Sequence, residues 1–175
     1  MEEKELTVGQ KLRKALTYQR KNGYDCLQPG ELEAIDVYCE AYKQYLDAGK
    51  TERECVDRTV AMAEAAGFRP FKRGMEAKPG DKYYYVNRDR AIMLAVIGKK
   101  SLAEGAAIGA AHIDSPRLDL KPNPLYESDE IAFFKTHYYG GIKKYQWTAI
   151  PLALHGVVYR KDGTMVTITI GEDDS

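Results

Sequence analysis

The sequence predicts an α/β protein in which N-terminal helices pack on a mixed sheet and a β-rich segment follows. In the first third of the chain, apolar residues recur at three- and four-residue steps, which indicates amphipathic helices. In the rest, short apolar and aromatic runs alternate with turn residues, which is typical of strands. A length of 175 residues, 44% of them hydrophobic and 30% charged, allows one domain or one domain and part of another.

Three helices are expected in the N-terminal part. The first covers about residues 8–20, and the second covers about residues 31–49, where apolar residues follow helical spacing. The third covers residues 51–67, because Thr51 and Glu54 form a capping box at its start.

Six strands are expected after these helices. They lie at residues 83–87, 92–97, 105–111, 131–136, 147–160 and 164–170. Residues 105–111 are small and apolar without alternation, which predicts a strand buried on both faces of a sheet. Lys161, Asp162 and Gly163 separate the last two runs and predict a hairpin.

Two prolines predict a domain boundary in the sequence Lys121-Pro122-Asn123-Pro124, because proline interrupts regular elements. We expect residues 1–121 to form the N-terminal part of one domain. Residues 122–175 would then begin a second, β-rich domain.

Composition excludes several classes of protein. The 26 Lys and Arg residues balance 26 Asp and Glu residues, so no net field attracts nucleic acid or an anionic membrane. No apolar run approaches the roughly 20 residues that span a bilayer, and the charged N-terminus is unlike a signal peptide. We therefore expect a cytoplasmic protein without nucleic-acid or membrane partners, whose cysteines Cys26, Cys39 and Cys55 are reduced thiols, with Cys39 packed on a helix face.

The candidate site follows the expected strand at residues 105–111. His112 and Asp114 are two residues apart, so in a strand their side chains would share one face. A carboxylate that accepts one imidazole N–H fixes the tautomer of the ring and makes it a better metal ligand. The spacing equally fits a structural histidine, and we expect His137 and His155 to pack or hydrogen-bond.

Two sequence blocks resemble the aspartyl aminopeptidase and vacuolar aminopeptidase I family of zinc metallopeptidases. Residues 111–118, Ala-His-Ile-Asp-Ser-Pro-Arg-Leu, resemble the first metal-ligand motif of the family in its bacterial form. The sequence Tyr-Tyr-Gly-Gly-Ile at residues 138–142, with Trp147 and residues 152–158 after it, resembles the next block. The similarity extends over about residues 83–172.

The resemblance implies a two-zinc exopeptidase that removes N-terminal amino acids from peptides. Its fold would be an α/β catalytic domain with an inserted β-rich oligomerisation domain. His112 would ligate one zinc ion, and Asp114 would orient that ligand. The other metal ligands and the glutamate general base of the family lie beyond this segment, so we expect an N-terminal fragment that is inactive alone.

A different hypothesis is a catalytically silent oligomerisation or binding module. In it, the helices and hairpins contact a partner, and His112 and Asp114 only hydrogen-bond to each other. Under either hypothesis we expect homo-oligomers, because the strands at residues 131–136 and 147–160 would otherwise expose apolar surface and sheet edges.

Overall fold

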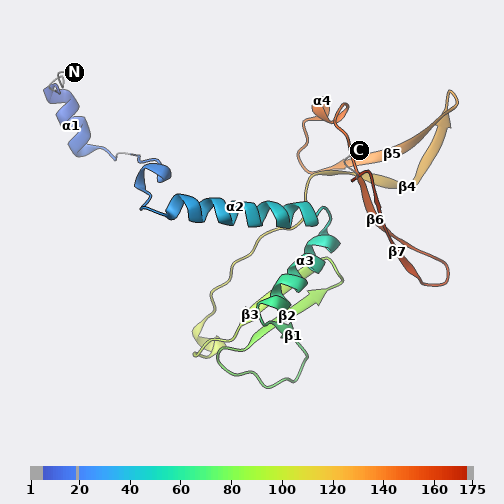
Figure 1. Ribbon diagram of the computed structural model, residues 1–175, viewed down its shortest axis with the longest axis horizontal. Helices are drawn as coiled ribbons and strands as arrows, with labels where there is room; N and C mark the ends of the chain where they lie inside the picture. The colour runs from blue at the N-terminus through green and yellow to red at the C-terminus, as the bar shows by residue number, and fades with distance from the viewer. Residues whose placement is uncertain (1–5, 19, 173–175) are drawn as a thin grey trace. The chain divides into compact units, whose positions relative to one another are not determined.

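The computed structural model describes residues 6–18 and 20–172, and Figure 1 shows their helices and strands. The chain divides into two compact units, Met1–Lys43 and Gln44–Ser175. Helices, one mixed sheet and two antiparallel hairpins together confirm the predicted α/β class. Each unit is described by itself.

The first unit is helical. Helix α1 (Val8–Leu16) begins with a capping box between Thr7 and Gln10. A short 3-10 helix (Gly23–Cys26) follows, and helix α2 (Glu31–Ala48) begins in this unit and ends in the second. No residue of these three helices is buried.

Two predictions for the helical segment are wrong. The first helix ends at Leu16 rather than near residue 20, because Thr17 has extended backbone and its hydroxyl donates to the carbonyl oxygen of Arg13 at 2.6 Å. Cys39 is exposed rather than packed, because α2 buries none of its residues.

The second unit is built on helix α3 (Glu52–Ala65), which packs on a three-stranded sheet. Strand β1 (Arg69–Pro70) pairs parallel to β2 (Lys82–Asn87), and β2 pairs antiparallel to β3 (Ala91–Val96). Figure 1 shows α3 beside β2 and β3. All buried hydrophobic residues of the described chain lie in α3 or in this sheet. They are Cys55, Val56, Ala63 and Tyr83.

Strand β4 (Arg117–Ser128) and strand β5 (Ile131–Tyr139) form a long antiparallel hairpin. Asp129 and Glu130 form its turn and both have positive φ, as in the type I′ turns that suit tight hairpins. The sequence did not predict β4, because prolines at positions 122 and 124 argue against a strand. The strand continues through them, and the pairing register shifts between Leu120 and Leu125.

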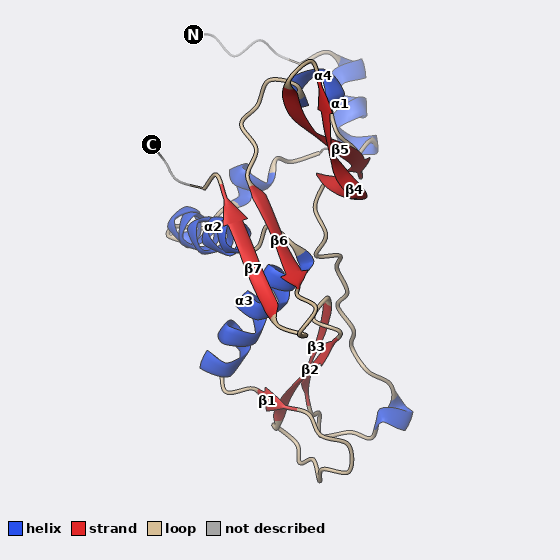
Figure 2. Cartoon of the chain, turned by 90° about the vertical axis from the view of Figure 1, so that its right-hand side faces the viewer, coloured by secondary structure: helices blue, strands red, loops and turns tan. Residues whose placement is uncertain are grey.

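A second hairpin pairs β6 (Leu154–Tyr159) with β7 (Met165–Ile170), as Figure 2 shows. Its turn contains the predicted Gly163, which has a φ of 84°. The predicted strand at residues 147–160 is wrong in its first half. Helix α4 (Lys144–Trp147) and an irregular stretch occupy that half, and Pro151 in this stretch has no backbone N–H to donate.

The predicted buried strand at residues 105–111 is also wrong. These residues have no regular structure and are exposed. A buried strand needs neighbouring strands for its backbone groups, and no strand in residues 6–18 and 20–172 pairs with this segment.

Candidate functional site

Four consecutive residues at the start of α3, here called the helix start (residues 52–55), each contact a different segment of the second unit. The contacts are Glu52 with Arg117 (3.2 Å), Arg53 with Asp89 (3.2 Å), Glu54 with His155 (2.7 Å), and the Cys55 sulfur with the carbonyl oxygen of Ile113 (3.6 Å). The helix start therefore joins the β2–β3 turn, both hairpins and the segment that carries His112.

His112 and Asp114 lie together at the end of the irregular segment that precedes β4. The Nδ1 atom of His112 is 2.9 Å from the backbone oxygen of Asp114 and 3.1 Å from its Oδ1 atom. A carbonyl oxygen can only accept a hydrogen bond, so Nδ1 must carry the proton. In the neutral ring, Nε2 then has a free lone pair, and the side chain is 82% exposed.

The hydroxyl of Tyr139, the last residue of β5, lowers the pKa of Asp114, and the bond to His112 acts in the same direction. The carboxylate in turn raises the pKa of the Tyr139 hydroxyl, because it stabilises the protonated phenol. The lowered pKa keeps Asp114 ionised, and its carboxylate accepts the hydrogen bond from Nδ1–H of His112.

Arg117 lies next to this group and is held in several directions. Its Nε donates to Asp119 at 2.7 Å, and its Nη1 donates to the backbone oxygen of Ser115 at 3.2 Å. Its Nη2 pairs with Glu52, and its guanidinium carbon lies 4.1 Å from the centroid of the Tyr139 ring. The arrangement is a cation–π contact in which the arginine is fixed by carboxylates.

His155 has a structural role, as the sequence suggested. Its Nδ1 lies 2.7 Å from Glu54, its Nε2 lies 2.6 Å from Glu172, and its side chain is only 12% exposed. Burial lowers the pKa of His155, but the hydrogen bonds to the two carboxylates outweigh burial and raise the pKa above its ordinary value. Both ring nitrogens are occupied, so the ring is not arranged as a metal ligand. His137 is exposed and its ring stacks on that of Tyr138.

The described residues do not form a complete metal centre. In residues 6–18 and 20–172, no three His, Cys, Asp or Glu side chains gather where they could hold an ion. A catalytic zinc site needs three protein ligands. The tautomer of His112 fits one of them, because the exposed Nε2 atom offers its lone pair. All three cysteines are free, as predicted, and burial raises the pKa of the Cys55 thiol, which disfavours a thiolate ligand.

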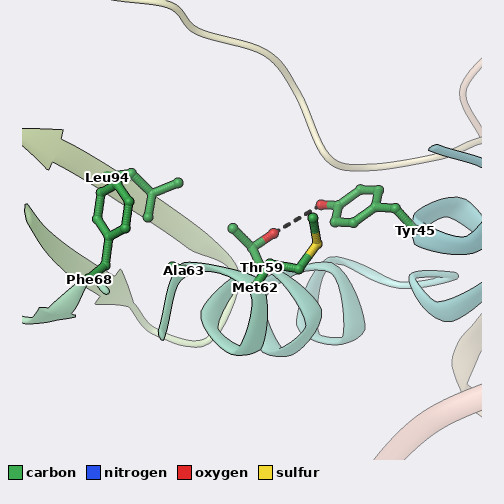
Figure 3. A pocket seen from close by; sticks show the side chains of 6 residues that line it. All are labelled: Tyr45, Thr59, Met62, Ala63, Phe68 and Leu94. Atoms are coloured by element: carbon green, nitrogen blue, oxygen red, sulfur yellow. Dashed lines mark hydrogen bonds between the residues drawn. The ribbon is translucent and has the colours of Figure 1, made fainter. Parts of the chain in front are cut away.

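An apolar pocket of about 360 Å³ lies elsewhere in the second unit, between α3, β3 and the last turn of α2. Figure 3 shows its lining, which consists of Tyr45, Thr59, Met62, Ala63, Phe68 and Leu94. The hydroxyl groups of Tyr45 and Thr59 lie 3.0 Å apart and satisfy each other. The pocket has no carboxylate, imidazole or cation and offers no group for catalysis.

The sequence predicts His112 and Asp114 in the site but gives no sign of the neighbouring Tyr139. The antiparallel pairing of β4 with β5 sets Arg117 opposite Tyr139, and β4 was not predicted. Counting outward from the Asp129-Glu130 turn would set Arg117 opposite Ile142 rather than Tyr139, because the pairing register shifts between Leu120 and Leu125, so the turn alone could not have found this pairing. Among the described helices, none is both long and apolar enough to cross a membrane.

Comparison with known proteins gives consistent results. The family model described as aminopeptidase I zinc metalloprotease (M18) matches residues 45–174. A probable M18 family aminopeptidase 1 of Clostridium acetobutylicum is 46% identical over 164 residues, which are 91% of this chain and 35% of that protein. The crystal structure of aminopeptidase I from Borrelia burgdorferi matches with a TM-score of 0.83 at 40% identity and covers 88% of this chain and 38% of that one.

A further crystal structure, of an M18 family aminopeptidase from Thermotoga maritima, matches with a TM-score of 0.80 at 41% identity. That match covers 90% of this chain and 34% of the solved one. This chain thus spans about a third of the length of the relatives that it matches. The family model covers most of the chain, and the resemblance inferred from the sequence is confirmed. The chain belongs to the aminopeptidase I zinc metalloprotease (M18) family.

Proposed function

We propose that the protein containing this chain is a zinc-dependent aminopeptidase that removes N-terminal amino acids from peptides, with His112 as a zinc ligand and Asp114 as its orienting partner. Membership of a zinc metalloprotease family supports the reaction class. The single observation that carries the residue assignment is the pair of contacts at Nδ1 of His112, because they leave Nε2 available for a metal.

The residues of this chain would prepare the ligand. Asp114 accepts a hydrogen bond from Nδ1–H of His112 and thereby fixes both the tautomer and the direction of the ring. The remaining ligands and the general base would come from outside residues 6–18 and 20–172. When bound, zinc would polarise a carbonyl group and lower the pKa of a water molecule toward neutrality.

Several finer statements belong to the same proposal. We propose two zinc ions in the complete protein, a cytoplasmic location and a homo-oligomer. We also propose that residues 1–121 belong to the catalytic domain and residues 122–175 to an inserted β-rich domain. The homo-oligomer is supported by the exposure of the β4–β5 hairpin, in which every residue of β5 is exposed. The names of the relatives favour a peptidase over a silent binding module.

The test is zinc affinity in the full-length protein. The variant Asp114→Asn keeps the size of the side chain but removes the charge that holds Nδ1–H. We expect its zinc affinity to fall by about 10–100-fold. The variant His112→Ala removes the ligand itself, and we expect loss of a zinc ion and of aminopeptidase activity toward aminoacyl substrates.

Asp129→Asn is the matched control. Asp129 lies at the turn of the β4–β5 hairpin, at a position with a φ of 52° that asparagine tolerates well, and 15 residues after Asp114 in the sequence. We expect unchanged zinc affinity in this variant. Wild-type zinc affinity in Asp114→Asn, or full zinc content and activity in His112→Ala, would contradict the assignment.

A further inference from the structure

We propose that Arg117 is a positioning residue for the His112–Asp114 pair, and that its guanidinium ties the backbone after Asp114 to the start of helix α3. The inference rests on the proposed function, because it concerns the same zinc ligand. The direction of the His112 ring would then depend on α3 and on the β4–β5 hairpin as well as on its own segment.

The guanidinium of Arg117 uses each of its three nitrogen atoms for a different acceptor. Nε donates to Asp119 at 2.7 Å, Nη1 donates to the backbone oxygen of Ser115 at 3.2 Å, and Nη2 lies 3.2 Å from the carboxylate of Glu52. These acceptors belong to β4, to the segment that carries His112 and to α3. A planar guanidinium holds acceptors on several sides at fixed angles, whereas an ammonium is a single point charge on a flexible stem.

The face of the guanidinium is held as well. Its central carbon lies 4.1 Å from the centroid of the Tyr139 ring, and strand pairing sets Tyr139 opposite Arg117. The next residue, Gly140, has a φ of 75°, and a Cβ atom placed on it would lie 3.4 Å from the Cα atom of Pro116. The end of β5 therefore covers one face of Arg117 and closely approaches the residue before it.

The backbone is fixed on both sides of Asp114. On the N-terminal side, the thiol of Cys55 donates to the carbonyl oxygen of Ile113 at 3.6 Å. On the C-terminal side, Arg117 donates to the carbonyl oxygen of Ser115. Cys55 belongs to the helix start, and Arg117 is paired with it, so both contacts connect this backbone to α3.

The residue between these two contacts carries the acceptors of the imidazole. The backbone oxygen and the Oδ1 atom of Asp114 lie 2.9 Å and 3.1 Å from Nδ1 of His112. A backbone released at Ser115 would let Asp114 turn, and Nδ1 would lose the acceptors that direct the ring. The contribution of Arg117 to zinc binding is therefore geometric, since by charge alone a cation disfavours a divalent metal ion beside it.

The experiment compares Arg117→Lys with Arg53→Lys in the full-length protein. Arg53 lies in the same helix start but pairs with Asp89 of the β2–β3 turn at 3.2 Å. Both variants keep the positive charge and lose the planar guanidinium. The zinc dissociation constant is measured by competition with a chelator. We expect Arg117→Lys to weaken zinc binding by about threefold to tenfold, and Arg53→Lys to leave it unchanged.

A second variant, Arg117→Gln, tests the sign of the effect. It removes a positive charge near the proposed zinc ligand, and charge alone would then strengthen the binding of a divalent cation. Positioning predicts the opposite, and we expect zinc binding to weaken by about threefold or more. Circular dichroism first shows which Arg117 variants are folded, and either one decides the test. Unchanged or stronger zinc binding in a folded Arg117 variant would overturn the inference.

A double-mutant cycle separates positioning through Asp114 from a general structural role. If Arg117 acts through Asp114, then adding Arg117→Lys to Asp114→Asn changes zinc affinity by less than about twofold. A full additive loss in that background, or equal losses in Arg117→Lys and Arg53→Lys, would also contradict the inference. If His112→Ala retains its zinc, the proposed function fails. If His112→Ala loses zinc while Arg117→Lys binds it normally, only the role of Arg117 fails.

Discussion

The α3 layer and the two long hairpins of the second unit are stabilised in different ways. In the described part of the chain, every buried hydrophobic residue belongs to α3 or β2. The β4–β5 and β6–β7 hairpins bury none and are joined to the helix start by charged side chains. Burial of apolar surface therefore stabilises the first region, while backbone pairing and ion pairs stabilise the second.

The difference shows what the hairpins require. An isolated two-stranded hairpin is marginally stable in water. The β4–β5 hairpin exposes Phe133, Phe134 and Leu125 as well as its tyrosines. Surfaces of this kind need cover from another part of a protein or from another chain.

The largest effect is expected in the α3 layer. Val56 is 1% exposed, and Val56→Ala should lower the free energy of unfolding by about 2–3 kcal/mol, because two buried carbon atoms are lost and a cavity remains. Val158→Ala on β6, where the side chain is 48% exposed, should cost less than about 1 kcal/mol. Urea denaturation followed by circular dichroism measures both. Equal losses of unfolding free energy in the two variants would contradict the proposed difference between the α3 layer and the hairpins.

A smaller, pH-dependent effect is expected at His155. Removing its two hydrogen bonds to carboxylates in His155→Gln should cost about 1–2 kcal/mol. The raised pKa of His155 means that this contribution is present below its ordinary pKa of 6.5 and is lost as pH rises through the folded pKa. Glu54 behaves in the opposite way. Its pKa is lowered despite burial, chiefly by the hydrogen bond to His155. Its contribution to the free energy of unfolding is therefore present above its ordinary pKa of 4.5 and is lost as the pH falls through its lower folded pKa.

The stability difference between wild type and His155→Gln should therefore be largest between about pH 4.5 and pH 6.5. Chemical denaturation across pH 4 to 9 measures it, and His137→Gln on the exposed face of β5 is the control. A difference that grows above pH 7 would show that the imidazolium does not stabilise the β6–β7 attachment.

The smallest effect is expected at the partly buried ion pair between Glu52 and Arg117. Glu52→Gln should lower the free energy of unfolding by about 1 kcal/mol, because Arg117 keeps its bond to Asp119. The exposed pair of Lys100 with Glu104 at 3.9 Å provides a comparison, and Glu104→Gln should cost less than about 0.5 kcal/mol. The same denaturation assay ranks the two, and a larger loss in Glu104→Gln would contradict the ranking.

Local signals predicted most of the elements. The capping residues Thr51 and Glu54 determine where α3 begins, and the glycine at position 163 determines the turn of the last hairpin. Predictions failed where structure depends on distant partners. Residues 105–111 have the composition of a buried strand, but a strand requires neighbours that the described chain does not supply.

The candidate site shows the same division. The two-residue spacing of His112 and Asp114 is local, and their side chains do meet, although in an irregular segment rather than a strand. The contact of Arg117 with Tyr139 joins the two ends of a hairpin whose first strand contains two prolines. No local pattern encodes that contact.

The helix start limits where the length of this chain can change. Successive residues of an α-helix are rotated by about 100°, so the four side chains of residues 52–55 fan out around the helix axis. Inserting one residue between Cys55 and the packed residue Val56 would turn all four away from their separate partners at once, whereas an extra residue at the Asp129-Glu130 tip would only lengthen a loop.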